Sequence, residues 1–150
     1  MAYSNRGGAY YGKREYDRAI ADFNEAIRLN PNDAAAYSNR GGAYHGKREY
    51  DRAIADFTQA IRLNPNDAMA YYNRGFAYVE KGDYDRAIAD LNQAIRLNPN
   101  DAKMYYLRGL LYAMKEDYTH ARADWEQALQ INPNYSDVKN MLEMLRKDGL

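Results

Sequence analysis

Few residues of this chain have the types and spacing that catalysis or metal binding requires. The two histidines, His45 and His120, could each serve as a general base or a metal ligand, but two copies of an internal repeat separate them. At that separation they cannot share a proton relay or a metal ion. There is no cysteine, and no serine or threonine lies in a nucleophile motif. We therefore expect no catalytic residue, no metal site and no cofactor, and hence no enzyme.

Arginine and aspartate recur at a fixed interval and could form ion pairs. An arginine occurs once per repeat, and an aspartate follows it sixteen residues later. A guanidinium beside a carboxylate forms a two-pronged, charge-assisted hydrogen bond, so the spacing predicts a ladder of Arg–Asp pairs between two helices. The alternative is a row of arginines that binds phosphate, but the row of aspartates would neutralise the charge of these arginines. The pairs are Arg6 and Asp22, Arg40 and Asp56, Arg74 and Asp90, and Arg108 and Asp124.

The elements that position these residues follow from a repeat of 34 residues. Four Asn-Pro-Asn sequences are spaced at this interval, with prolines at 31, 65, 99 and 133. Such a period is typical of stacked-repeat architectures. Within each period two segments have apolar residues at helical spacing, such as Tyr37, Gly41 and Tyr44 in the first segment of the second repeat. The sequence therefore predicts two amphipathic helices per repeat, which we term helix A and helix B.

The connections between these helices have recognisable sequence signals. The turn from helix A to helix B is short and polar, as at residues 46–49, and such a turn favours an antiparallel pair. After helix B, Pro65 disfavours helical geometry in the residue before it, and Asp67 is a suitable N-cap for the next helix. The sequence thus predicts a helical hairpin in each repeat.

The chain resembles the tetratricopeptide repeat (TPR) family, whose pattern is Trp-x2-Leu-Gly-x2-Tyr, Ala-x3-Phe and Pro. The second repeat has Tyr37-x2-Arg40-Gly41-x2-Tyr44, then Ala53-x3-Phe57, then Pro65. The sequences of the repeats are similar to those of bacterial members of the family or to those of a consensus-like, engineered array. The resemblance implies an all-α fold: a right-handed superhelix, or α-solenoid, of four helix-turn-helix repeats with a C-terminal capping helix.

We expect a single domain over residues 1–150. The last segment has Val138, Met141, Leu142 and Leu145 at helical spacing without a second helix, as expected of a helix that covers the end of an array. The chain begins almost at the first residue of a helix A, which favours an excised or engineered module. The predicted repeats are 1–33, 34–67, 68–101 and 102–135, followed by a capping helix at 136–150.

Half of the differences between the second and third repeats fall on one stripe of helix A. Four of the eight positions that differ are 38, 42, 45 and 46, whereas the packing residues Tyr, Gly, Tyr, Ala and Ile of the helices stay the same. In the family this stripe faces a concave groove, and an Asn beside it commonly binds the backbone of a peptide. The alternative is that the rings only fill space between neighbouring helices A. The candidate groove residues are Asn5, Asn39, Asn73, Tyr72, Phe76, Tyr106, Leu110, His45 and Met114.

These observations favour a scaffold that binds a peptide or protein segment in its groove. The alternative is a structural, self-associating or engineered module without an external ligand, either a monomer or a weak homo-oligomer formed by stacking of repeat ends. A basic clamp for chaperone tails is not expected, because Ser4 and Gly8 stand where the family's first-repeat Lys and Asn would be. Lys plus Arg and Asp plus Glu both total 21, so we expect neither a nucleic-acid nor a membrane partner. No signal peptide is recognisable at the start, so a cytoplasmic location is the default expectation.

Overall fold

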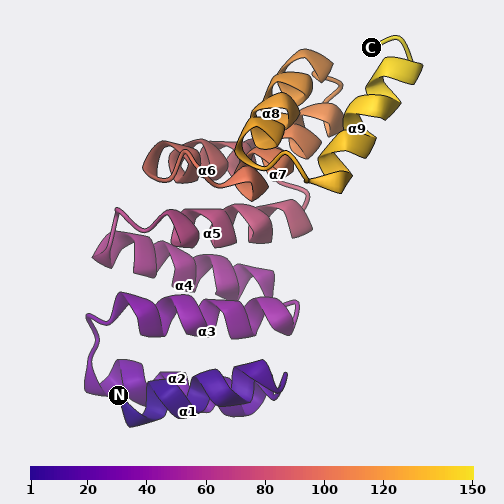
Figure 1. Cartoon of the computed structure of the whole chain (residues 1–150). Helices are drawn as coiled ribbons and strands as arrows, with labels where there is room; N and C mark the ends of the chain where they lie inside the picture. The colour runs from indigo at the N-terminus through magenta and orange to yellow at the C-terminus, as the bar shows by residue number, and fades with distance from the viewer. The chain divides into compact units, whose positions relative to one another are not determined.

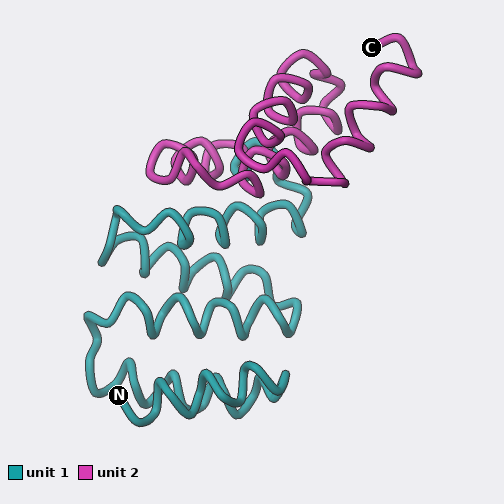
Figure 2. Tube along the Cα trace, in the orientation of Figure 1, with its two compact units in different colours: residues 1–87 teal, residues 88–150 magenta.

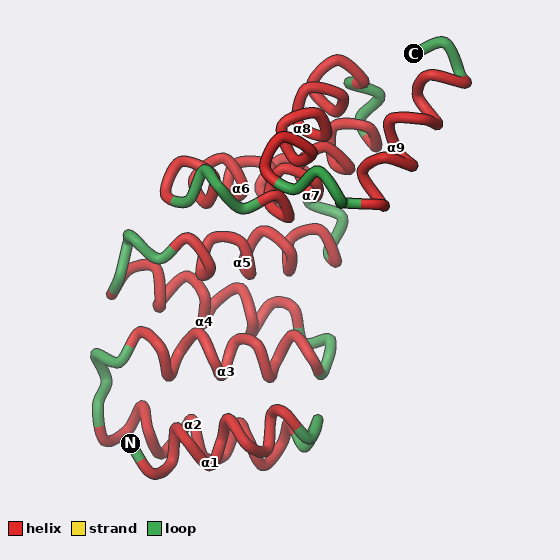
Figure 3. Tube along the Cα trace, in the orientation of Figure 1, coloured by secondary structure: helices red, strands yellow, loops and turns green.

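The protein is all-helical. The computed structural model describes every residue from 1 to 150 and contains no strand (Figures 1 and 3). This confirms the predicted fold class of paired helices followed by a final single helix. The helices are α1 (Ala2–Gly12), α2 (Tyr16–Leu29), α3 (Ala34–Gly46), α4 (Tyr50–Leu63), α5 (Ala68–Glu80), α6 (Tyr84–Leu97), α7 (Ala102–Met114), α8 (Tyr118–Ile131) and α9 (Ser136–Lys147).

The chain forms two compact units, residues 1–87 and 88–150 (Figure 2). In the first unit each helix packs on the next, from α1 through α5. In the second unit α7 packs on α8, and α8 packs on α9. The buried face of α9 includes Val138 and Leu145, two of the residues whose spacing predicted a capping helix. A single domain with the four predicted repeat boundaries stays a prediction.

The helices A end in a hydrogen-bonded motif that reverses the chain. In the first hairpin the Arg14 amide donates to the Tyr11 carbonyl at 2.9 Å, and the Glu15 amide donates to the Tyr10 carbonyl at 2.9 Å. These two bonds require a left-handed residue just after the helix. Glycine is the residue best suited to that conformation, yet only one of the four hairpins has it there. The four residues are Arg14, Arg48, Gly82 and Glu116, with φ of 60°, 62°, 76° and 61°.

The Asn-Pro-Asn-Asp loops fulfil the predicted role of ending one helix and starting the next. Asn30 precedes proline and adopts an extended backbone, with φ −139° and ψ 90°. Asp33 then caps α3, because its carboxylate accepts hydrogen bonds from the amides of Ala35 and Ala36. Asp67 caps α5 in the same manner, and the Asp101 carboxylate accepts a single hydrogen bond from the Lys103 amide at the start of α7. The N-cap prediction is thereby confirmed at three loops.

Close contact between a glycine and an aromatic ring sets the spacing within the first, second and fourth hairpins. A Cβ atom added at Gly41 would lie 2.9 Å from the Phe57 ring, and one at Gly109 would lie 2.5 Å from the Trp125 ring. Both rings are almost completely buried, at 2% exposure. The recurring interval between glycine and ring in the repeats therefore reflects the approach of helix B to the backbone of helix A.

Candidate functional site

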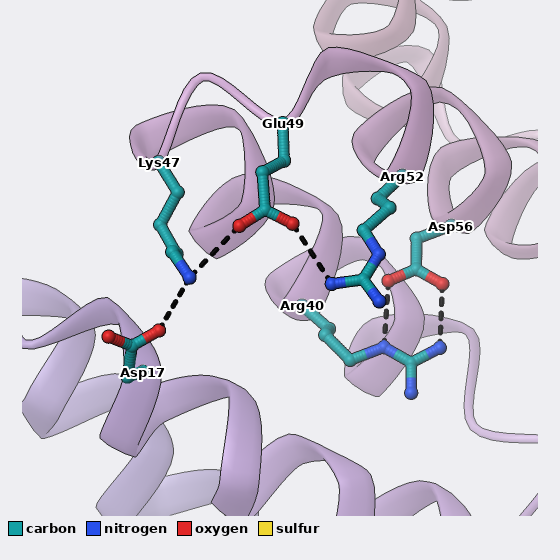
Figure 4. Close-up of polar contacts among 6 residues, drawn as sticks. All are labelled: Asp17, Arg40, Lys47, Glu49, Arg52 and Asp56. Atoms are coloured by element: carbon teal, nitrogen blue, oxygen red, sulfur yellow. Dashed lines mark hydrogen bonds and ion pairs between the residues drawn. The ribbon is translucent and has the colours of Figure 1, made fainter.

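The Arg–Asp ladder is present in the three hairpins that lie within one unit. Arg40 Nε donates to Asp56 Oδ2 at 2.8 Å, and Arg40 Nη2 donates to Asp56 Oδ1 at 2.7 Å (Figure 4). Arg6 and Asp22 form the same pair, as do Arg108 and Asp124. The pairing is structural, since each guanidinium has its charge matched by its own carboxylate, and a phosphate-binding column is not favoured. The fourth pair, Arg74 with Asp90, stays a prediction.

The ion pairs raise the pKa of their arginines, and in the first pair the pKa of the aspartate is lowered as well. The pKa of Asp22 is lowered by its hydrogen bonds to Arg6, and burial opposes this shift only in part. The pKa of Arg40 is raised, chiefly by its hydrogen bonds to Asp56. In the Arg6–Asp22 pair both shifts favour the ionised form of the side chain.

A hollow lies in the first unit, along the helices that were predicted to line a groove. It has a volume of about 170 Å³ and receives side chains or backbone from α1, α2, α3 and α5. No charged residue lines it. The lining residues are Gly8, Tyr11, Phe23, Ser38, Asn39, Gly42 and Asn73.

Two glycines explain why this hollow exists. A Cβ atom added at Gly8 would meet nothing within 4 Å, and one at Gly42 would lie 3.5 Å from the Tyr11 hydroxyl, at ordinary contact distance. The equivalent positions in the next two repeats carry Phe76 and Leu110. The hollow is thus the space that a large side chain occupies in the later repeats.

Asn39 and Asn73 are the predicted site residues that the structure brings to this hollow. They come from α3 and α5, and neither carboxamide has a side-chain hydrogen bond to another residue. Asn5 is exposed on α1 and does not line the hollow. The binding role of all three asparagines stays a prediction.

His45 and Phe76, which are both half-buried, pack on each other. Their ring centroids are 5.3 Å apart, and the His45 ring is also 5.4 Å from that of Tyr50. The Nε2 atom of His45 is buried without a hydrogen-bond partner. Burial lowers the pKa of His45, and the charge of Glu80 offsets this only partly. Phe76 therefore fills space between α3 and α5, whatever further contact it makes with a ligand.

The other predicted groove residues differ in exposure. Tyr72 is half-buried on α5, and Met114 is 57% exposed at the end of α7. In the second unit Tyr106 and Leu110 pack against the core around Trp125, and the Tyr106 ring lies 5.2 Å from that of Tyr135. Burial raises the pKa of Tyr106.

The sequence signal for the hollow is the run of glycines on the variable stripe of helix A in the first two repeats. Those glycines do not have a common role. A Cβ atom at Gly46 would lie 2.5 Å from the Tyr16 ring, so Gly46 permits close packing between neighbouring hairpins. Gly8 and Gly42 instead leave space.

The remaining histidine belongs to a helix start. His120 Nδ1 lies 2.7 Å from Asp117 Oδ2, and its ring stacks on Tyr112 at 5.0 Å. No group of three or more His, Cys, Asp or Glu side chains is placed to hold a metal ion. None of the nine helices has the length and apolar character needed to cross a membrane.

Comparison with known families and structures identifies the repeat. Three family models described as tetratricopeptide repeat match residues 5–68, 57–89 and 102–135, and one described as TPR repeat matches 77–116. No curated protein matches the sequence.

Several solved structures are similar over most of the chain. The crystal structure of MamA is 26% identical, with a TM-score of 0.89 over 96% of this chain and 85% of that one. The first TPR of Spaghetti (RPAP3), bound to the HSP90 peptide SRMEEVD, is 27% identical, with a TM-score of 0.73 over 77% and 91%. TTC0263, a thermophilic TPR protein from Thermus thermophilus, is 20% identical, with a TM-score of 0.77 over 90% of this chain and 75% of that one. At this identity the similarity concerns the fold alone.

Proposed function

Because the chain belongs to the tetratricopeptide repeat family, whose members are generally protein–protein interaction scaffolds, we propose that its first unit binds an extended peptide at the hollow lined by Asn39 and Asn73. The observation that carries the proposal is that Asn39 of α3 and Asn73 of α5 both line one uncharged hollow. Each carboxamide can donate and accept hydrogen bonds, as the backbone of an extended peptide also does.

The size and lining of the hollow favour one apolar side chain of the peptide. A cavity of about 150 Å³ lined by apolar side chains is large enough for benzene, and the hollow measures about 170 Å³. The Phe23 ring, which is 1% exposed, contributes an apolar surface. Such a site selects the peptide by its backbone and by one side chain of leucine or phenylalanine size.

A charged peptide terminus is not the preferred ligand. The related Spaghetti domain is bound to a peptide with acidic residues, but no cationic side chain lines the hollow of this chain. Ser4 and Gly8, where the family's clamp would have Lys and Asn, have no charge to offer a carboxylate. We therefore place the proposed ligand among uncharged, extended segments.

The test begins with selection of peptides from a display library against the intact protein, followed by affinity measurement with synthetic versions. Gly42→Leu should fill the hollow and weaken binding at least tenfold, while retaining the fold, because Leu110 occupies the equivalent position in the second unit. Asn73→Ala should weaken binding by about fivefold, for one lost hydrogen bond of about 1 kcal/mol.

Gly12→Leu is the matched control. Gly12 is on α1, an added Cβ atom there would meet nothing within 4 Å, and it does not line the hollow. Its affinity for the selected peptides should equal that of the unmodified protein. Peptides that bind Gly42→Leu as tightly as the unmodified protein would exclude the hollow as the binding site.

The predicted alternative is a self-associating module. Light scattering after size-exclusion chromatography at several concentrations distinguishes the two, because a concentration-independent monomer excludes association by end stacking. Peptide binding by such a monomer would then assign the protein to the scaffold class.

A further inference from the structure

The contact between α3 and α5 shows how the space of the hollow is filled when a large side chain is present. In the first unit the helices A contact each other in succession, α1 with α3 and α3 with α5. Phe76 of α5 stands at the position equivalent to Gly42, and His45 of α3 at the position equivalent to Tyr11. The Phe76 ring packs on the His45 ring with centroids 5.3 Å apart and planes tilted by 42°. One repeat later, an aromatic ring thus occupies the place that Gly42 leaves empty.

The same approach exists between α1 and α3, without the second ring. A Cβ atom added at Gly42 would lie 3.5 Å from the Tyr11 hydroxyl and 3.6 Å from Cε2 of the Tyr11 ring. These are ordinary contact distances, so a side chain at this place would lie directly against Tyr11. Position 42 therefore faces position 11 as position 76 faces position 45.

The Tyr11 ring is held in the orientation that the His45 ring has. The Tyr11 ring lies 5.8 Å from the Tyr16 ring with a tilt of 58°, and the His45 ring lies 5.4 Å from the Tyr50 ring with a tilt of 59°. Tyr11 is also 44% exposed and lines the hollow. Tyr11 therefore offers the hollow the ring surface that His45 offers Phe76.

The remaining walls of the hollow also suit a ring. Phe23 lines the hollow from α2 and is 1% exposed. Ser38 lines it from α3, at the position where the third repeat has Tyr72. The hollow thus lies beside two aromatic rings, Tyr11 and Phe23, and beside two small residues of α3, Ser38 and Gly42.

We propose that the hollow selects an aromatic side chain of the bound peptide, and that Tyr11 is the residue that determines this specificity. The inference rests on the proposed function, because it names the side chain that the same site accepts. The peptide ring takes the place against Tyr11 that Phe76 takes against His45. Asn39 and Asn73 precede positions 42 and 76 by three residues, so each carboxamide lies about one helical turn from a ring position and can bind the peptide backbone beside it.

Contact between rings favours an aromatic side chain over an aliphatic one of similar size. Tilted ring pairs with centroids about 4.5–7 Å apart are stabilised beyond the area that they bury. This extra stabilisation corresponds to a preference of about threefold to tenfold for phenylalanine over leucine.

The first test requires no peptide. Gly42→Phe introduces a ring at the position equivalent to Phe76, and a crystal structure of the variant should show this ring in the hollow, packed on Tyr11. Gly42→Leu is the matched variant, because both substitutions remove a glycine from the interior of α3. The Tm of Gly42→Phe should exceed that of Gly42→Leu, and the difference should vanish when both variants also carry Tyr11→Leu.

The second test uses the display-selected peptides, with affinities for the intact protein measured by isothermal titration calorimetry. We expect an aromatic residue to recur at one position of these peptides. Replacing it with leucine should weaken binding about threefold to tenfold. Against Tyr11→Leu, the aromatic and leucine versions of a peptide should bind with equal affinity.

Tyr3→Leu is the control for the loss of a tyrosine from α1. Tyr3 is 37% exposed, close to the exposure of Tyr11, and does not line the hollow. Tyr3→Leu should therefore keep the full preference for the aromatic version of each peptide.

The outcomes that overturn the inference are distinguishable from failure of the peptide-binding site. An introduced ring in Gly42→Phe that points away from Tyr11 would exclude the proposed place, and an undiminished aromatic preference in Tyr11→Leu would exclude Tyr11 as its cause. Peptides that bind without a common aromatic residue, but lose affinity for Gly42→Leu, would overturn the specificity and leave the proposed function intact. Failure to select any peptide would overturn both.

Discussion

Removal of the Asp56 carboxylate tests whether the Arg–Asp pairs stabilise the hairpins. Asp56→Ala deletes two short hydrogen bonds, of 2.8 and 2.7 Å, and leaves the Arg40 guanidinium at a site where Asp56 is 6% exposed and the Arg40 side chain is 20% exposed. Loss of one partner of a buried ion pair costs about 3–5 kcal/mol. Since Arg40 keeps its bond to Asn24 and a partly exposed edge, we expect the lower end of this range, about 3 kcal/mol.

The assay is urea unfolding followed by circular dichroism, with thermal unfolding as a second measurement. A loss of about 3 kcal/mol corresponds to a fall in Tm of roughly 6–12 °C for a chain of this size. Asp22→Ala is the matched variant, because the residues are the same but the Arg6 side chain is 59% exposed. Its destabilisation should be clearly smaller, since water can solvate the guanidinium that is left behind.

The double variant Arg40→Leu with Asp56→Ala separates the cost of losing the ion pair from the cost of leaving the Arg40 charge unpaired. Leucine is the residue of the family pattern at this position, and replacing a whole buried ion pair with apolar residues is often close to neutral. The double variant should therefore be more stable than Asp56→Ala. Equal stability of Asp56→Ala and the unmodified protein, or equal losses for Asp22→Ala and Asp56→Ala, would refute the reasoning.

Three further predictions use backbone geometry and burial. Arg48→Gly should raise the free energy of unfolding by about 1 kcal/mol in urea titrations, because its φ of 62° is costly for a side chain other than glycine. Gly41→Ala should lower it by about 1–3 kcal/mol through the close contact with Phe57, whereas Gly8→Ala should raise it by about 1 kcal/mol because its Cβ enters open space in a helix. The pKa of His45 in the folded protein lies below its ordinary value of 6.5, so the unfolded chain binds more protons in this range. The free energy of unfolding should therefore fall as the pH drops from 7.5 to 5. His45→Val should flatten this pH dependence in a pH series of thermal unfolding.

Much of the fold could be predicted because its signals are local. Proline and aspartate mark each boundary between repeats, and the i, i+16 spacing of Arg and Asp predicted three ion pairs that the structure contains. The left-handed residues that end the helices A could not be predicted from residue type. Only Gly82 has the expected identity, whereas Arg14 and Arg48 adopt the same backbone. The chain reversal that packs helix B on helix A imposes that conformation against local preference.

The candidate site was less predictable, because side chains fill space according to their neighbours. The variable stripe of helix A indicated which face to consider, but it also suggested that the aromatic positions form the pockets. Phe76 packs on His45, and the hollow lies beside Gly42, where no side chain competes for the space. A volume left empty depends on three or four helices at once, so periodicity within one helix cannot reveal it.

Near-identical repeats make it possible to separate the effect of a helix's own sequence on an ion pair from the effect of the helix that packs beside it. Residues 2–10 of α1 and 36–44 of α3 have the same sequence. Arg6 and Arg40 each bind the aspartate of their own hairpin with the same geometry. The exposure of the arginine nevertheless differs threefold, because α2 covers α3 whereas no helix of this chain covers α1 in that way. The geometry of the ion pair is almost the same with and without a neighbouring hairpin on that side. The difference in stability between Asp22→Ala and Asp56→Ala therefore measures how much the neighbouring hairpin strengthens the pair.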